Sequence, residues 1–251
     1  MVGLRILLAP AVAALLLAPA FASGAMRYTS PTGTGVACSQ AAPCSLATGV
    51  NNASAGDEVR LTADEYYLDT QLVISQPNVT IFGPPGRYAP SDFRSFIFFL
   101  TEAEGGPLGF DDLTKLLVQQ DGFSLLRVSV NGSAGTQILI DGTVANDMLI
   151  DRVTITDNGS DITVVGQDAI VRNSVIHQVT GTYAVGVTGS ITGSTVTSAA
   201  GSAIVNSDND HQPGDYCELD VTNTIAVGDV RNMRTVDGLS GCDPVIRVNY
   251  S

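Results

Sequence analysis

Short apolar runs recur along the second half of this chain, and each one is followed by polar residues or glycine. In one series, three apolar or small positions repeat at the same offsets around a polar kink. The middle members stand at positions 125, 150, 171 and 191, so the spacing is 20–25 residues. The repeats of this series are Phe123/Leu125/Val130, Met148/Ile150/Ile155, Ala169/Val171/Ile176 and Gly189/Ile191/Val196. Repeats of this length that are rich in Val, Ile and Thr indicate a β-solenoid.

A second apolar series lies between the members of the first. It consists of Leu116/Val118, Ile138/Ile140, Ile162/Val164, Val185/Val187 and Ile204. Two series in register predict at least two short strands in every turn of the solenoid. The segments between them contain Asn-Gly, Asp-Gly and Thr-Gly pairs, which form turns. Glycine and asparagine interrupt the apolar runs too often for helices.

A β-sandwich would place strands at similar intervals, so it remains the alternative fold. The polar kinks favour the solenoid because they too recur once per turn. Arg127, Arg152, Asn173 and Gly193 all stand two residues after the middle apolar member. In a coiled chain these residues would lie above one another at about 4.8 Å, the distance between paired strands. At 20–25 residues per turn, we expect roughly eight turns.

The amino-terminal part carries a family resemblance. Residues 44–50 read Cys-Ser-Leu-Ala-Thr-Gly-Val, and they precede Gly56-Asp57 and the run at residues 79–84, Val-Thr-Ile-Phe-Gly-Pro. This opening resembles right-handed parallel β-helix proteins of the pectin-lyase-like superfamily, in the variety that begins Cys-Ser-Leu-Arg-Glu-Ala-Ile. Ala-Thr-Gly replaces Arg-Glu-Ala here. Leu46 and Val50 would share one face of a short helix that covers the open end of the solenoid.

The resemblance implies a fold, while the activity has to be read from a site. Relatives that hydrolyse polygalacturonate carry Asn-Thr-Asp, His-Gly and Arg-Ile-Lys elements, which this sequence lacks. Relatives that act as lyases use an Arg or Lys base beside calcium-binding acids, and no such cluster can be picked out. We therefore expect an exported non-catalytic scaffold or adhesin-like module that contacts glycans. A polysaccharide lyase or glycoside hydrolase is the alternative, and a passenger fragment of a larger surface protein is a third hypothesis.

Residues 1–25 are predicted to be a secretory signal, which leaves residues 26–251 as one β-helix domain. Arg5 precedes an apolar run at residues 6–17, and Ala20-Phe21-Ala22 offers a cleavage site. Pro10 interrupts the run, which argues against a membrane span. A secreted or cell-surface location favours disulfides, and we expect the pairs Cys38–Cys44 and Cys217–Cys242.

The charge balance narrows the class of partner. The chain has 12 basic and 25 acidic residues, and Lys115 is its only lysine. This balance disfavours nucleic acid and anionic membranes, since both bind to positive surfaces. An extracellular polysaccharide or a cell-surface component remains the expected partner. The absence of Trp and an aromatic content of 6% leave few platforms for sugar stacking.

Candidate binding residues fall in two places. One is an expanded polar loop that contains Asp208, Asp210, His211 and Asp215. Its alternating carboxylates are oxygen ligands of the kind that calcium prefers, although a solvated loop explains them as well. The other is a set of three arginines on neighbouring turns, Arg127, Arg152 and Arg172. Stacked guanidinium groups would bind uronate carboxylates, unless they neutralise neighbours such as Asp151.

Overall fold

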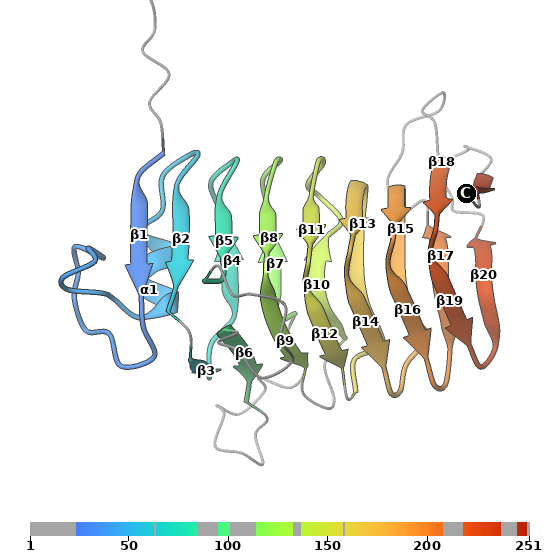
Figure 1. Cartoon of the computed structure of the whole chain (residues 1–251), viewed down its shortest axis with the longest axis horizontal. Coiled ribbons are helices and arrows are strands. Elements are labelled where there is room, and N and C mark those ends of the chain that lie inside the picture. The colour runs from blue at the N-terminus through green and yellow to red at the C-terminus, as the bar shows by residue number, and fades with distance from the viewer. Residues whose placement is uncertain are drawn as a thin grey trace, which may run out of the picture.

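The computed structural model describes residues 24–62, 64–84, 95–100, 114–132, 137–157, 159–207, 218–236 and 245–249. Within these ranges the chain winds into coils that stack along the longest axis of the molecule (Figure 1). Every pairing between named strands is parallel. This rules out the β-sandwich and confirms the predicted parallel β-helix.

Each coil contributes strands to three columns, which we call the first, second and third column. The first column contains β1 (Met26–Thr29), β2 (Glu58–Leu61), β5 (Thr80–Phe82), β8 (Ser124–Leu126), β11 (Leu149–Asp151), the ends of β13 (Ile162–Arg172) and β15 (Tyr183–Thr192), β18 (Glu218–Thr222) and β21 (Val245–Asn249). The second column is the seven-stranded sheet of β3 (Glu65–Leu68), β6 (Ser95–Phe99), β9 (Val128–Gly132), β12 (Thr154–Asp157), β14 (Val175–Gln178), β16 (Thr195–Ser198) and β19 (Ile225–Gly228). The third column contains β4 (Leu72–Ile74), β7 (Leu116–Val118), β10 (Ile138–Gly142), the beginnings of β13 and β15, β17 (Ser202–Ser207) and β20 (Arg231–Val236).

The described strands therefore belong to seven coils, one for each strand of the second column, where roughly eight were expected. β1 and β21 add a further rung to the first column at either end. β1 has no counterpart in the sequence prediction, because it is a four-residue strand directly after the expected signal.

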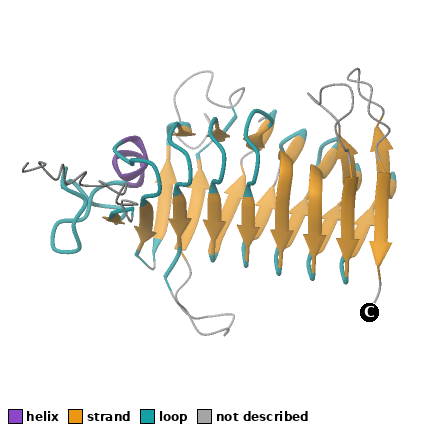
Figure 2. Cartoon of the chain, turned by 90° about the horizontal axis from the view of Figure 1, so that it is seen from above, coloured by secondary structure: helices purple, strands orange, loops and turns teal. Residues whose placement is uncertain are grey.

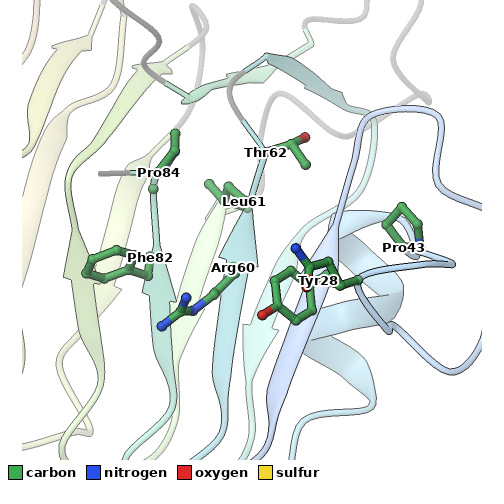
Figure 3. Close-up of a pocket in the computed structure, with 9 residues that line it drawn as sticks. Tyr28, Pro43, Arg60, Leu61, Thr62, Phe82 and Pro84 are labelled. Carbon is green, nitrogen blue, oxygen red and sulfur yellow. The ribbon is translucent and has the colours of Figure 1, made fainter. Parts of the chain in front are cut away.

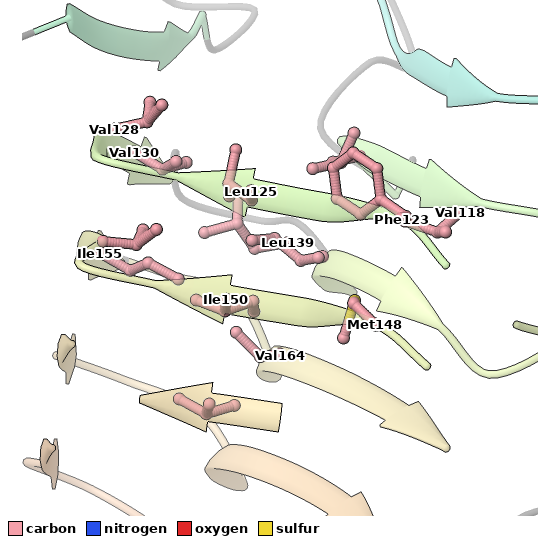
Figure 4. Close-up of a cluster of buried hydrophobic side chains, with 14 of the residues drawn as sticks. Val118, Phe123, Leu125, Val128, Val130, Leu139, Met148, Ile150, Ile155 and Val164 are labelled. Atoms are coloured by element: carbon pink, nitrogen blue, oxygen red, sulfur yellow. The ribbon is translucent and has the colours of Figure 1, made fainter. Parts of the chain in front are cut away.

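The core consists of like residues stacked on like. Leu125, Ile150, Val171 and Ile191 pair in successive rungs of the first column, as the first apolar series predicted. All four are fully buried. Figure 4 shows this interior, where Phe123, Met148 and the second-column residues fill the space between the columns. Burial of each such side chain contributes roughly 1.5–3 kcal/mol relative to exposure, so the stack is the main source of stability.

The second apolar series was aligned wrongly at two steps. The prediction placed Leu116 against Ile138, but the structure pairs Leu116 with Ile140. Likewise Val185 pairs with Val164 and not with Ile162. Both errors are shifts of two residues. Because side chains alternate between the faces of a strand, such a shift leaves the same residues facing the core.

The polar kinks form one continuous corner between the first and second columns. Arg127, Arg152, Asn173, Gly193 and Asn223 all have left-handed backbone conformations, with φ between +48° and +57°. The amide of each donates to the carbonyl of the next coil at 3.0–3.2 Å. The predicted equivalence of the first four positions is thus confirmed.

Hydroxyl groups continue this corner on its inner side. Ser174, Ser194 and Thr224 follow the left-handed residues, and each is buried. The Ser174 hydroxyl accepts from the Val153 amide at 3.1 Å, and the Ser194 hydroxyl accepts from the Ser174 amide at 3.2 Å. These side chains satisfy amides that the bend removes from the strand ladder.

The amino-terminal end is covered by α1 (Leu46–Asn51), as predicted (Figure 2). Ser45 caps the helix by accepting from the Thr48 amide at 3.1 Å, and Leu46 and Val50 are buried on its inner face. The predicted disulfide between Cys38 and Cys44 is present. It closes a loop that lies along β1, where the Tyr28 amide donates to the Cys38 carbonyl at 2.7 Å. Cys217 and Cys242 lie outside the described residues.

Two ionisable residues of the described coils are fully buried. Lys115 is fully buried at the start of β7, and its backbone carbonyl accepts from the Leu72 amide at 2.9 Å. Asp157 is fully buried at the end of β12 and accepts from the Thr163 hydroxyl at 2.7 Å and from the Ser160 amide at 3.1 Å. No helix among the described residues is long and apolar enough to cross a membrane.

Candidate functional site

The outer surface of the first column gathers side chains that a ligand could contact. Residues alternate along each strand, so one line of outward residues runs across the coils just before the left-handed corner. The strand register joins Tyr28 to Arg60 and Arg60 to Phe82, and it continues through Leu126 to Asp151 and Arg172. The amino-terminal half of this line is aromatic and basic.

A cavity of about 260 Å³ opens at this end, and we call it the Tyr28 pocket (Figure 3). Its wall consists of Tyr28, Gln40, Pro43, Arg60, Leu61, Thr62, Phe82, Gly83 and Pro84. These residues come from β1, β2, β5 and the loop that the Cys38–Cys44 disulfide closes. Rings and prolines dominate the wall, and Arg60 supplies its charge. Such a mixture suits a ring-shaped ligand that has an apolar face and polar edges.

Two arginines hold the Phe82 ring on the edge of the pocket. The guanidinium carbon of Arg60 lies 5.9 Å from the ring centre, and that of Arg127 lies 5.5 Å from it. Arg60 also forms an ion pair with Glu58 on the same strand. Gly83 permits the close approach of the next coil, because a Cβ there would lie 2.0 Å from the Arg127 carbonyl oxygen.

Further along the corner, Arg152 and Arg172 flank a buried carboxylate. Asp151 lies 3.2 Å from Arg172 and 3.8 Å from Arg152, and the Asn173 amide donates to it at 3.0 Å. Burial of Asp151 raises its pKa, but the hydrogen bonds from Asn173 and Arg172 and the two positive charges outweigh burial. The net result is a lowered pKa. Asp151 therefore stays ionised, and the side chains of Arg152 and Arg172 remain 39% and 47% exposed.

Arg60, Arg127, Arg152 and Arg172 together form what we call the arginine row. The structure brings the three predicted arginines together on one edge, and it adds Arg60. Glu58 and Asp151 compensate the row only in part, on a chain whose net charge is −13. The guanidinium groups of Arg127, Arg152 and Arg172, on three successive rungs, can bind carboxylates that recur along a polymer, while Tyr28 and Phe82 can contact the apolar faces of sugar rings.

Two buried carboxylates, Asp57 and Asp151, have structural partners. Asp57 accepts from the Ala25 amide at 2.7 Å, the Ser54 amide at 2.9 Å and Arg27 at 2.6 Å. Burial raises the pKa of Asp57, but these hydrogen bonds and the Arg27 charge lower it overall. Asp151 accepts hydrogen bonds from Arg172 and Asn173. Such ionised, fully hydrogen-bonded groups are poor proton donors at neutral pH.

The predicted polar loop cannot be placed. Asp208, Asp210, His211 and Asp215 lie outside the described residues, so the calcium hypothesis stays a prediction. The described ranges contain no group of three or more His, Cys, Asp or Glu side chains arranged to hold a metal ion. His177 is exposed on β14 and lies 2.6 Å from the Thr197 hydroxyl of the next coil.

Sequence reasoning missed Tyr28, Arg60 and Phe82. Phe82 stands in the run at residues 79–84 that carries the family resemblance, Arg60 stands three residues after Gly56-Asp57, and each directly follows a core residue of its strand. Knowledge of the parallel register of β2 and β5 would have placed Arg60 beside Phe82, and this register is seen only in the structure. Tyr28 lies on β1, which was not expected to be a strand.

No known family model matches this sequence. No curated protein matches it either. Among solved structures, the chain is similar to pectate lyase Pel9A, with a TM-score of 0.57 and a sequence identity of 12%. The similarity covers 90% of this chain and 62% of the other, so this chain spans less than two thirds of the length of its structural neighbour. The protein therefore has the right-handed parallel β-helix fold that pectate lyase Pel9A also has.

Proposed function

We propose that this chain is an exported, non-catalytic β-helix protein that binds a carboxylated polysaccharide along the arginine row, with one sugar ring in the Tyr28 pocket. The observation that carries the proposal is the arginine row beside Phe82 and Tyr28 on an otherwise acidic chain. Rungs repeat at about 4.8 Å, which is close to the length of one sugar residue, so Arg127, Arg152 and Arg172 can meet successive carboxylates. The molecule would act as a cell-surface or extracellular scaffold.

Export rests on the predicted signal at residues 1–25 and on the disulfide. Cys38–Cys44 supports an oxidising compartment, because thiols are kept reduced in the cytosol. The non-catalytic part of the proposal is supported by the hydrogen bonds that occupy Asp57 and Asp151. Both carboxylates stabilise turns or corners of the coil.

Binding to immobilised polygalacturonate and to neutral dextran tests the proposal. We expect retention on polygalacturonate alone, with an affinity that falls as salt rises, because the contacts are ionic. The double variant Arg60→Gln/Arg127→Gln should lose about tenfold or more in affinity, since each charge-assisted hydrogen bond is worth about 1.5–3 kcal/mol. Arg247→Gln is the matched control, because Arg247 is exposed on β21 at the far end of the same column. Equal binding by wild type and the double variant would contradict the proposal.

A polysaccharide lyase or hydrolase is the second candidate, favoured by the fold shared with a pectate lyase. The same polysaccharides, incubated with the protein in the presence and absence of calcium, distinguish the two. New reducing ends or an unsaturated product would establish an enzyme. If a variant lacking Asp208, Asp210 and His211 then lost this activity, the polar loop would be the catalytic site.

A further inference from the structure

The surface beyond the arginine row differs between its two ends. Toward the carboxyl terminus, the outward line continues from Arg172 through Thr192 and Thr222 to Asn249. These side chains are short and uncharged, and they lie on successive paired rungs about 4.8 Å apart. Over the described strands, a polymer that follows the row can therefore extend past Arg172 in this direction.

At the amino-terminal end, the row stops at the loop that the Cys38–Cys44 disulfide closes. One edge of β1 pairs with β2, and this loop lies on the other edge. The Tyr28 amide donates to the Cys38 carbonyl at 2.7 Å, and the Tyr28 carbonyl accepts from the Cys44 amide at 3.1 Å. The Ser30 amide then donates to the Cys44 carbonyl at 2.9 Å. The loop therefore takes the place of a further rung in front of β1.

Residues of this loop close the Tyr28 pocket on its amino-terminal side. Gln40 and Pro43 both line the pocket. Figure 3 shows Pro43 on the far side of Tyr28 from Arg60 and Phe82. The cavity of about 260 Å³ is smaller than the roughly 300–1,000 Å³ of sites for drug-sized ligands, so it has room for a single sugar ring.

The pocket offers a contact for each part of such a ring. Tyr28 and Phe82 present aromatic surface to its apolar face. The Arg60 side chain is 41% exposed and pairs with Glu58 through its Nε atom, so its other N–H groups can bind a carboxylate. Gln40 is exposed, and its side-chain amide can both donate to and accept from ring hydroxyl groups. The pocket therefore suits one whole uronate residue.

We propose that the Tyr28 pocket holds the terminal uronate of the polysaccharide, so that the protein binds chain ends. The inference rests on the proposed function, because it assigns a direction to the same site. An internal stretch of polymer has to leave the pocket on both sides, and the loop closed by the disulfide bars one of them. A terminal residue leaves only toward Phe82, from which the chain runs along Arg127, Arg152 and Arg172.

Polygalacturonate of two chain lengths tests the proposal. One preparation is divided, and half of it is hydrolysed to chains that are shorter but still longer than the arginine row. A repeating polymer offers internal sites in proportion to its mass, whereas each chain has a single end of either kind, so chains about tenfold shorter should bind about tenfold more protein per gram at saturation. Calorimetric titration measures this number. A number that does not change with chain length would overturn the proposal.

The double variant Gln40→Ala/Pro43→Ala trims the closed side of the pocket and leaves the arginine row intact. It should still bind polygalacturonate, but the amount bound per gram should no longer depend on chain length, because the polymer can now pass the loop. Val36→Ala is the matched control and should keep the dependence. Val36 is an 82% exposed valine two residues before Cys38, and it is not part of the pocket wall.

The outcomes separate this inference from the proposed function. If the double variant keeps the dependence on chain length, the loop is not the barrier and the inference fails. If the wild type shows no such dependence but Arg60→Gln/Arg127→Gln still weakens binding, the inference fails and the proposed function stands. A wild type that does not bind polygalacturonate at all would overturn the proposed function, and the inference with it.

Discussion

Asp151 is the residue at which three coils are tied together. It belongs to β11, its partners Arg172 and Asn173 lie one coil later, and Leu126 pairs with it from the coil before. The sequence showed Asp151 beside the arginines. Whether these arginines bind a ligand or neutralise the carboxylate depends on how much of each guanidinium stays exposed. In the structure both arginines lie beside Asp151, and their side chains stay 39% and 47% exposed, so neutralising the carboxylate leaves part of each side chain within reach of a ligand.

The lowered pKa of Asp151 predicts a pH-dependent contribution to stability. Its charge is stabilised in the folded chain, so this contribution is present above the usual carboxyl pKa and is lost as the pH falls through the lower, folded value. We expect Asp151→Asn to reduce the free energy of unfolding by about 1 kcal/mol at pH 7. Urea unfolding from pH 7 down to pH 2.5 would measure it, with the exposed Asp220→Asn as control. The difference should shrink toward the acid end, and a difference that does not change with pH would contradict the assignment.

Individual residues also show where sequence reasoning reached its limit. Leu125, Ile150, Val171 and Ile191 were aligned correctly because each has a polar kink two residues later that fixes its place in the coil. The second apolar series has no such marker, so the shift of two residues at Leu116 and Val185 could not be detected. The Tyr28 pocket depends on β1, β2 and β5 being neighbouring rungs, and the composition of residues 26–84 does not reveal this pairing.

At the scale of elements, the left-handed corner sets the shape of every coil. Five consecutive coils place one residue there, and the sequence uses Arg, Arg, Asn, Gly and Asn in turn. Asn and Gly tolerate this conformation well. Arg127 and Arg152 do not gain from it locally. Instead, the corner directs their side chains to the edge of the first column, where the arginine row is formed.

Gly193 allows the cost of this conformation to be measured without a clash. It has a φ of +56°, and a Cβ added at this position would have the Asn173 side-chain oxygen as its nearest neighbour, at 3.4 Å. Gly193→Ala should therefore lower the free energy of unfolding by about 1 kcal/mol through backbone strain alone. Gly193→Asn should cost less, because asparagine enters this region more readily. Thermal unfolding of both variants would decide, and equal melting temperatures for Ala and Asn would contradict the explanation.

The whole molecule behaves as a one-dimensional stack, in which each coil contacts only its neighbours. α1 and the loop closed by Cys38–Cys44 cover the first coil, so their effect should be confined to that end. The sequence predicted this cap well, since Leu46 and Val50 are spaced to share one face of a short helix. It did not predict β1, on which the capping loop lies.

Removing the disulfide tests this local coupling. Closing a six-residue loop contributes about 2 kcal/mol in the chain-entropy model, so Cys38→Ser/Cys44→Ser should loosen the amino-terminal end by that amount. Hydrogen exchange should accelerate at the amides of β1 and α1. The amides of β14 and β16, several coils away, should exchange as in the wild type and serve as the internal control. Uniform acceleration along all described coils would show that the molecule opens as one unit.

The burial of Lys115 gives the folded protein an unusual resistance to lysine-directed reagents. Lys115 is the only lysine in the sequence, and it is fully buried. Amine-reactive dyes and lysine-specific proteases therefore meet no accessible lysine ammonium group on the folded coils. Either reagent should act at this position only after the coils around β7 have separated, so lysine labelling would report directly on opening of the stack.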